Sequence, residues 1–151
     1  FGSFQQLLVA PAQWRSDLGR LSAPKDLAAF PFIANSQLKQ HSRWTFSRGD
    51  QRQTVTMKTT MLFDATLATR EAAIGGAGLT VLPDYTITAD LAEGRLIRVL
   101  PKWVLPRGNI SAVFPTARFR PAKVRAFMDV LTGRLTKSST VTGARQATPG
   151  N

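Results

Sequence analysis

The sequence predicts an α/β fold, in which helices cover small sheets. Short apolar runs typical of buried strands alternate along the chain with segments whose apolar residues recur at helical spacing. Prolines and glycines separate these segments, as expected where strands and helices end. Of the 151 residues, 43% are hydrophobic, which suffices for one compact domain or for two small lobes that share strands.

The predicted strands are short and mostly apolar, and each ends near a proline or a polar turn. They cover residues 7–10, 32–34, 79–82, 96–100 and 110–114. Two further stretches, 43–46 and 54–57, alternate apolar and polar side chains around Arg48, Gly49 and Asp50, which supply turn chemistry. These two stretches therefore predict a β-hairpin.

Helices are predicted where apolar residues recur every three or four positions. They cover residues 22–30, 64–75 and 84–92, and a fourth runs from Pro121 to just before Gly133. Ser22 is expected to cap the first helix, and Asp64 or Thr66 the second. Residues 136–151 lose the apolar pattern and are rich in Ser, Thr, Gly, Ala and Arg, so we expect a disordered tail.

Three glycines, Gly75, Gly76 and Gly78, lie between a predicted helix and a predicted strand. A dinucleotide-binding glycine motif would instead follow a strand and open a helix. We therefore expect a structural role, in which Gly76 and Gly78 adopt positive φ and let the helix end turn tightly into a buried strand.

The chain carries a formal charge of +11, from 20 Lys and Arg against 9 Asp and Glu. Such a charge favours approach to nucleic acid or to an anionic surface. The basic residues, however, are scattered singly, with a looser concentration between Lys102 and Arg145 and no arginine-rich run. This distribution favours a solvated surface or an affinity for small anions over direct nucleic-acid binding, which stays an alternative.

Nothing in the sequence predicts catalysis, a metal site or a cofactor site. His41 is the only histidine and lies in a polar loop, so we expect it at the surface. Asp84 and Asp90 lie within a predicted helix and are expected to be ordinary exposed acids. No spacing of His, Asp or Glu is typical of a set of metal ligands.

Compartment and membrane signals are few. The absence of cysteine excludes disulfides and thiolate metal sites and fits a reducing compartment. No apolar stretch approaches the roughly 18 residues needed to cross a bilayer, so no membrane association is expected. The chain begins Phe1-Gly2-Ser3, without the basic and apolar segments of a secretion signal, and we interpret this end as a cut.

Four groups of residues follow one another along the chain. They are LVAPA at 8–12 with PKDL at 24–27 and FPFI at 30–33, then WTF at 44–46, then EAAIGGAGLTVLP at 71–83, and DLAEGRLIRVLP at 90–101 with KVRAFM at 123–128. In this order and spacing they resemble the C-terminal part of the effector-binding region of LysR-type transcription regulators, over residues 6–134. The chain departs from the family pattern where Ala10 meets Pro11 without an intervening serine, and where Asp64-Ala65 replaces a frequent Asn-Asp.

The resemblance implies an α/β effector domain of the type 2 periplasmic-binding-protein architecture, which has two lobes. Residues 1–135 would form part of this region, with one complete lobe at about 11–100 and a return to the other lobe at about 104–135. A helix-turn-helix DNA-binding domain, a linker helix and the first half-lobe would lie upstream of Phe1, so DNA would be contacted only through that missing domain. The family implies a cytoplasmic protein that is not an enzyme, and apolar surface left uncovered would promote self-association.

In two-lobe sensors of this kind a small-molecule effector binds in the cleft at the ends of the strands, and two crossing segments act as hinges. The hinges would be Val9, Ala10 and Pro11 in the first segment and Leu100, Pro101, Lys102 and Trp103 in the second. The loops facing the cleft would contribute Asn35, Ser36, Gln37, Asp64, Ala65 and Thr66 to the effector site. Donors such as Asn35, Ser36 and Thr66 suit an anionic effector; alternatively, these residues only cap and turn.

Two rival functions remain open at this point. A solute-binding protein of the same architecture would be exported and would need a secretion signal, whereas a regulator would have a helix-turn-helix upstream. A basic nucleic-acid-binding module would bind DNA through this segment alone, with steep salt dependence.

Overall fold

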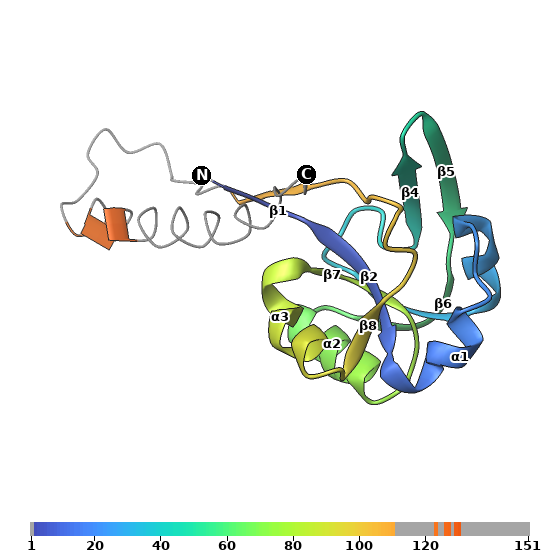
Figure 1. Cartoon of the computed structure of the whole chain (residues 1–151). Helices are drawn as coiled ribbons and strands as arrows, with labels where there is room; N and C mark the ends of the chain where they lie inside the picture. The colour runs from blue at the N-terminus through green and yellow to red at the C-terminus, as the bar shows by residue number, and fades with distance from the viewer. Residues whose placement is uncertain (1, 111–122, 124–125, 128, 131–151) are drawn as a thin grey trace, which may run out of the picture. The chain divides into compact units, whose positions relative to one another are not determined.

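The computed structural model describes residues 2–110, together with Lys123, residues 126–127 and residues 129–130 (Figure 1). The chain divides into two compact units: residues 4–108, which we call the main unit, and residues 1–3 with 109–151. The expected disordered tail, the boundary at residue 135 and most of the expected last strand and helix lie outside the described residues.

A three-stranded antiparallel sheet forms the centre of the main unit. Strand β2 (Gln6–Pro11) lies between β7 (Thr80–Pro83) and β8 (Leu96–Arg98) (Figure 1). The strands predicted at residues 7–10 and 79–82 are confirmed as β2 and β7. β8 ends earlier than predicted because the chain turns: Leu100 has a φ of 49°, and the Trp103 N–H donates to the Leu100 carbonyl at 2.9 Å.

β2 separates two hydrophobic cores, because successive side chains of a strand point to opposite faces of the sheet. Leu8 and Ala10 enter the first core, and Leu7 and Val9 enter the second. The first core also holds side chains from a β-hairpin and from the chain that follows β8. The second core is covered by two helices.

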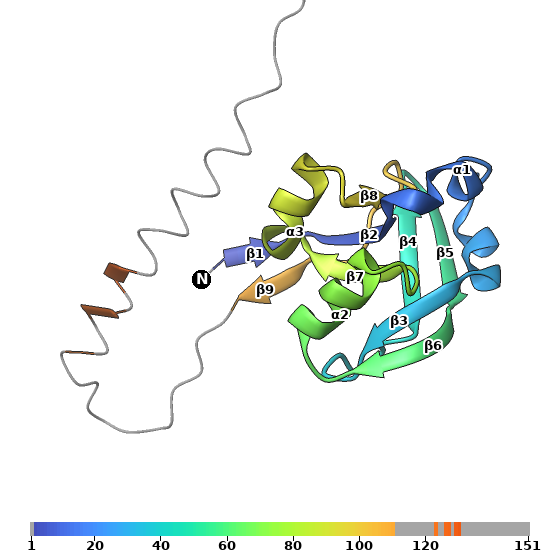
Figure 2. The same ribbon diagram turned by 90° about the horizontal axis from the view of Figure 1, so that it is seen from below.

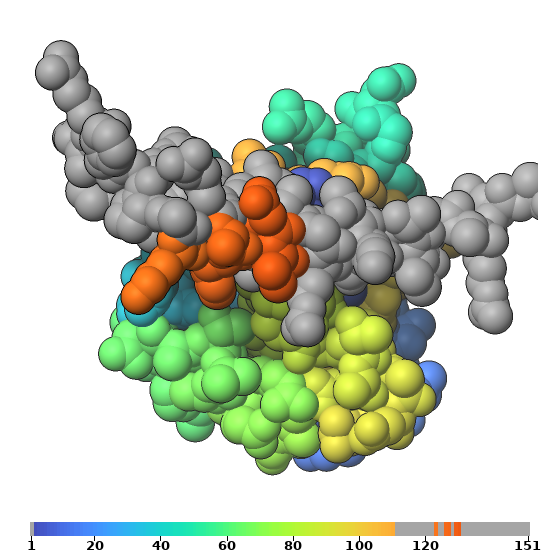
Figure 3. All heavy atoms as spheres, turned by 90° about the vertical axis from the view of Figure 1, so that its left-hand side faces the viewer, coloured from blue at the N-terminus to red at the C-terminus, as the bar shows by residue number. Residues whose placement is uncertain are grey.

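Helices α2 (Thr66–Ile74) and α3 (Asp84–Ala92) lie side by side over the second core, where they bury Ala73 and Ile87. Their outer faces form a continuous part of the surface, green and yellow in Figure 3. Both helices confirm the prediction, and α3 has the predicted bounds. The apolar faces of these helices are therefore explained by packing on the sheet.

Asp90 of α3 is buried and paired, so the expectation of an exposed acid is wrong. Its carboxylate accepts hydrogen bonds from Arg70 Nε at 2.6 Å, from Arg70 Nη2 at 2.8 Å and from Arg95 Nε at 2.9 Å. The bonds from Arg70 hold the pKa of Asp90 below its usual value, against the opposing effect of burial. Asp84 is half-buried and accepts a hydrogen bond from the Tyr85 N–H at 2.9 Å.

A second sheet pairs β3 (Pro31–Asn35) with β6 (Lys58–Phe63) in parallel. The sequence predicts β3 but not β6. Because nearly all side chains of β6 are exposed, no core-facing position alternates with a solvent-facing one, and the strand gives no periodic signal. Its apolar residues Met61 and Leu62 are 44% and 54% exposed.

The glycines between α2 and β7 have the structural role that was expected. Gly76 has a φ of +94°, as predicted, but Gly78 does not have a positive φ. A Cβ atom on Gly78 would lie 2.7 Å from the Pro31 carbonyl oxygen, so this position needs glycine for close approach instead. The approach lets the Leu79 N–H donate to the Pro31 carbonyl at 2.9 Å and the Ile33 N–H donate to the Leu79 carbonyl at 2.8 Å.

The predicted hairpin is confirmed, with β4 (Arg43–Arg48) antiparallel to β5 (Gln51–Thr56) (Figure 2). Gly49 has a φ of 57° in its turn. Trp44 and Phe46 alternate into the first core, which fixes the register of the hairpin.

Three short helical segments follow β2: η1 (Ala12–Trp14), α1 (Arg15–Leu18) and η2 (Pro24–Ala29). The last is a 3-10 helix in place of the longer helix predicted there. Its N-cap is Ala23, whose backbone N–H donates to the Asp26 carboxylate at 3.2 Å, and no side chain caps the helix. The prediction that the Ser22 side chain caps this helix is therefore wrong.

Two short strands extend beyond the limits of the main unit. β1 (Gly2–Phe4) ends at its first residue, β9 (Gly108–Ile110) begins at its last, and the two strands pair in a two-stranded sheet. The described residues between 123 and 130 are helical, as predicted, and Phe127 and Val130 among them are 65% and 61% exposed.

Candidate functional site

The two loops predicted to face the effector lie at the same edge of the parallel β3–β6 pair. Asn35 ends β3, and the register places it beside Phe63, the last residue of β6. Asn35 Nδ2 donates to Thr66 Oγ1 at 3.3 Å, and the Ser36 N–H donates to the Phe63 carbonyl at 2.8 Å. The fold therefore brings the two loops together, which a shared site requires.

Some polar groups in these loops form hydrogen bonds with other residues of the same loops. Asn35 Nδ2 donates to Thr66 Oγ1, and Asn35 Oδ1 accepts from the Gln37 N–H at 3.1 Å. Helix α2 has Ala65 as its N-cap and no capping side chain, so the expectation that Asp64 or Thr66 caps it is wrong. Asn35 and Thr66 are half-buried, and the exposed members of the set are Ser36, Gln37, Asp64 and Ala65.

An open hollow of about 240 Å³ adjoins the first of these loops. It is lined by Gln6, Leu38, Gln40, Arg43, Trp44, Thr45 and Pro106. Leu38 connects it to the loop, because the Leu38 N–H donates to the Asn35 carbonyl at 3.1 Å. Sequence reasoning missed this set because it comes from four separate segments; the one available signal is the alternation in β4, which turns Arg43 and Thr45 away from the core.

His41 is half-buried rather than on the surface, which corrects the expectation. Its carbonyl accepts from Trp44 Nε1 at 3.3 Å, and its Nδ1 atom is enclosed without a hydrogen-bond partner among the described residues. Within the described part of the chain, no three His, Cys, Asp or Glu residues are grouped as metal ligands would be. None of the described helices is long and apolar enough to cross a membrane.

Both predicted hinge segments lie inside the main unit. Val9, Ala10 and Pro11 are buried in β2. The second segment follows β8 and consists of Leu100, Pro101, Lys102 and Trp103, the last buried in the first core. The chain passes between the two units elsewhere, after residue 3 and after residue 108. The hinge role of these residues stays a prediction.

Comparison with known proteins gives the family. The model of the LysR substrate binding domain matches residues 1–136. The chain is 40% identical over 128 residues to the HTH-type transcriptional regulator PtxR of Pseudomonas aeruginosa, covering 85% of this chain and 41% of that protein. It is 31% identical over 115 residues to the RuBisCO operon transcriptional regulator of Acidithiobacillus ferrooxidans, covering 72% and 35% respectively. The chain thus spans less than half the length of these relatives, which are transcriptional regulators and not enzymes.

Solved structures confirm the predicted fold class. The virulence activator AphB of Vibrio cholerae is similar with a TM-score of 0.74 at 23% identity, over 88% of this chain and 46% of that one. The regulatory domain of CrgA, a LysR-type regulator of Neisseria meningitidis, is similar with a TM-score of 0.70 at 19% identity, over 89% and 66% respectively. The chain belongs to the LysR substrate-binding family and is part of the effector-binding domain of a LysR-type transcriptional regulator.

Proposed function

We propose that this domain binds a small polar or anionic effector at the edge where β3 and β6 end. The observation that supports this most directly is the hydrogen bond from Asn35 to Thr66, which holds the two loops together. The Ser36 and Thr66 hydroxyls and the uncapped first turn of α2 offer donors to an anion. Arg43 adds a guanidinium in the adjoining hollow.

Effector binding would change the arrangement of the lobes of the complete regulator, with residues 9–11 and 100–103 as the proposed hinges. A ligand shifts such a balance only by its differential affinity for the two states. DNA would be bound in the cytoplasm by a helix-turn-helix domain of the full regulator. The names of the matched relatives, which are HTH-type regulators longer than this chain, support this part of the proposal.

Self-association through this region is a further part of the proposal. Met61 and Leu62 on β6 and Leu67 on α2 are exposed apolar side chains, the last 67% exposed. Among the described strands β6 pairs only with β3, so its outer edge keeps unpaired backbone groups. The isolated chain is expected to associate in analytical ultracentrifugation. A monodisperse monomer that unfolds cooperatively would contradict this.

The effector site is tested by replacing Ser36 and Thr66 together by alanine in a full-length regulator that carries this domain. Loss of two donors, and of the Asn35–Thr66 hydrogen bond between the loops, is expected to raise about tenfold the effector concentration that gives half of the maximal promoter response, without unfolding the domain. The control, Ser16→Ala with Thr88→Ala, removes one serine and one threonine hydroxyl from α1 and α3 and is expected to leave the response unchanged. If the first variant responds normally, Ser36 and Thr66 are not part of the site.

A further inference from the structure

A second hollow is larger, at about 450 Å³. It lies toward the Pro11 end of β2, whereas the hollow beside the effector loops lies at the Gln6 end. Gln6, at the start of β2, lines the first hollow. Ile97 lines the second and pairs with Ala10, near the end of β2. All its lining residues belong to the main unit. Its volume falls within the range of roughly 300–1,000 Å³ that is usual for small-molecule sites.

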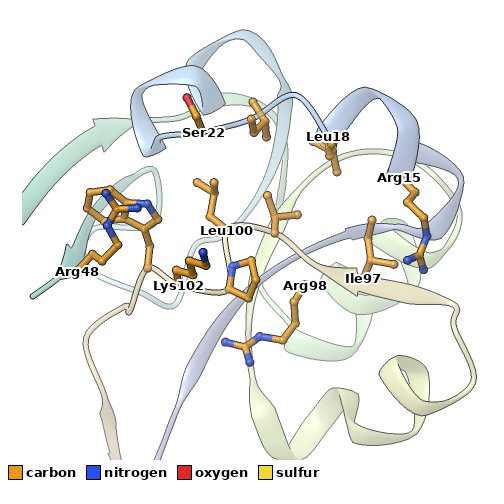
Figure 4. A pocket seen from close by; sticks show the side chains of 13 residues that line it. Arg15, Leu18, Ser22, Arg48, Ile97, Arg98, Leu100 and Lys102 are labelled. Carbon is orange, nitrogen blue, oxygen red and sulfur yellow. The ribbon is translucent and has the colours of Figure 1, made fainter.

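Three cationic side chains line this hollow. They are Arg15, Arg48 and Lys102, and no carboxylate is among the described residues that line it (Figure 4). Arg98 also contributes to the lining, but its guanidinium group points away from Leu100, because it lies on the opposite face of β8 from Ile97 and Val99. The three cations come from three separate parts of the chain, so the fold gathers like charges that would repel one another. A bound anion would relieve that repulsion.

These cations are not neutralised by acids in the described part of the chain. The ion pairs found there use Arg70 and Arg95, and none uses a cation of this hollow. Arg48 donates to Gln51 Oε1 at 3.0 Å, and its Cζ atom lies 4.7 Å from the centroid of the Trp103 ring, so its partners are neutral. The hollow therefore keeps a local excess of positive charge.

The wall between the cations is apolar. Leu18 and Val99 are buried there, and Leu21, Ile97 and Leu100 are half-buried. A bare phosphate or sulfate would leave this wall in contact with water. An anion with an apolar body would cover the wall and place its charge among the guanidinium groups, which match the geometry of a carboxylate.

Backbone strain marks the same place. Among the described residues, Leu100 is the one residue other than glycine with a positive φ, at 49°. Bulky residues rarely adopt this conformation, and such strain is often found at ligand sites. Here it turns the chain between Val99 and Pro101 so that residues 97–103 line the hollow.

We propose that this hollow is a second ligand site, which binds a small organic carboxylate with an aromatic or branched apolar body. The apolar part would lie against Leu18, Ile97 and Leu100, and the carboxylate would pair with the surrounding cations. This site is separate from the proposed effector loops and does not depend on them.

The test is isothermal titration calorimetry on the 151-residue chain with 4-tert-butylbenzoate as the probe and 4-tert-butylbenzamide as its neutral counterpart. The Arg15→Gln, Lys102→Gln variant is expected to bind the carboxylate at least about tenfold more weakly, the loss typical of a charge-assisted hydrogen bond. The control Arg52→Gln, Lys58→Gln also removes one arginine and one lysine, both exposed and outside the hollow. It is expected to change the affinity less than about twofold. Circular dichroism checks that both variants are folded.

Binding of the carboxylate, loss in the hollow variant and retention in the control support the proposal. Equal losses of affinity in the two variants would show that binding depends only on the net charge of the chain. Equal binding of the amide, or equal binding of inorganic phosphate, would show that the hollow does not select an apolar anion. Each of these results, and a failure to detect carboxylate binding, overturns the proposal.

Discussion

The two ends of β2 carry two different kinds of surface. Near Gln6, hydroxyl and amide groups of two loops lie beside a hollow with the single guanidinium of Arg43. Toward Pro11, three cations lie beside an apolar wall. The two loops lie close together because the parallel strands β3 and β6 end at the same edge of their sheet. The cationic hollow follows from the packing of segments that are distant in sequence.

The largest expected effect is on stability, from removal of the buried carboxylate that joins α3 to α2. Asp90→Ala is expected to destabilise the chain by about 3 kcal/mol, the low end for a broken buried ion pair, because Arg70 and Arg95 can reach solvent. Asp90 ties α3 to α2, whose first residue is Thr66 of the candidate site. Urea unfolding followed by circular dichroism measures the loss.

The control for this prediction is Glu93→Ala, which removes an exposed partner of Arg95. Its cost is expected to be about 1 kcal/mol or less, as for other surface ion pairs. Equal losses in the two variants would mean that burial of Asp90 contributes nothing.

A smaller effect is expected from two glycine replacements. Gly78→Ala is expected to cost about 2 kcal/mol, because the new Cβ would lie 2.7 Å from the Pro31 carbonyl oxygen. Gly19→Ala, beside the cationic hollow, places its Cβ 3.4 Å from the Arg15 carbonyl oxygen and is expected to change stability by about 0.5 kcal/mol or less. Thermal unfolding compares them, and a tolerated Gly78→Ala would contradict the need for close approach.

The pairing of Asp90 also predicts a pH dependence. Its pKa is lowered in the folded chain, so the stabilisation is present above the unfolded-state pKa of about 4 and is lost as the pH falls through the folded pKa. The melting temperature is expected to fall more steeply below about pH 4 in the wild type than in Asp90→Asn. Parallel curves would show that Asp90 makes no such contribution.

The smallest effect is expected at the cationic hollow. Arg15→Gln with Lys102→Gln is expected to leave the free energy of unfolding within about 0.5 kcal/mol of the wild type, because neither side chain has an ion-pair partner among the described residues. A loss above about 1 kcal/mol in urea unfolding would indicate a structural role for these cations.

Local patterns predicted much of the fold. Three elements depend only on neighbouring residues: the apolar run of β2, the turn at Gly49 and helix α3. Each is found where it was predicted. The exposed strand β6 has no such pattern, because it is held by backbone pairing to β3 rather than by a buried face.

The candidate site was predictable only in part. The loops after β3 and before α2 were identified by resemblance, and their proximity depends on the parallel pairing that the sequence does not reveal. The buried state of Asp90 could not be predicted, since its partner Arg70 lies 20 positions earlier. The cationic hollow likewise requires Arg15, Arg48 and Lys102, which are distant in sequence, to line one hollow.

The difference between the two ends of β2 is tested most directly by amide chemical-shift mapping of the ¹⁵N-labelled chain during titration with 4-tert-butylbenzoate. The account predicts shifts concentrated at Leu18, at residues 97–100 and at residues 102–103, with residues 35–37 and 64–66 unaffected. Shifts at the two loops, or shifts spread evenly over the basic surface, would contradict a separate carboxylate site at the cationic end of β2.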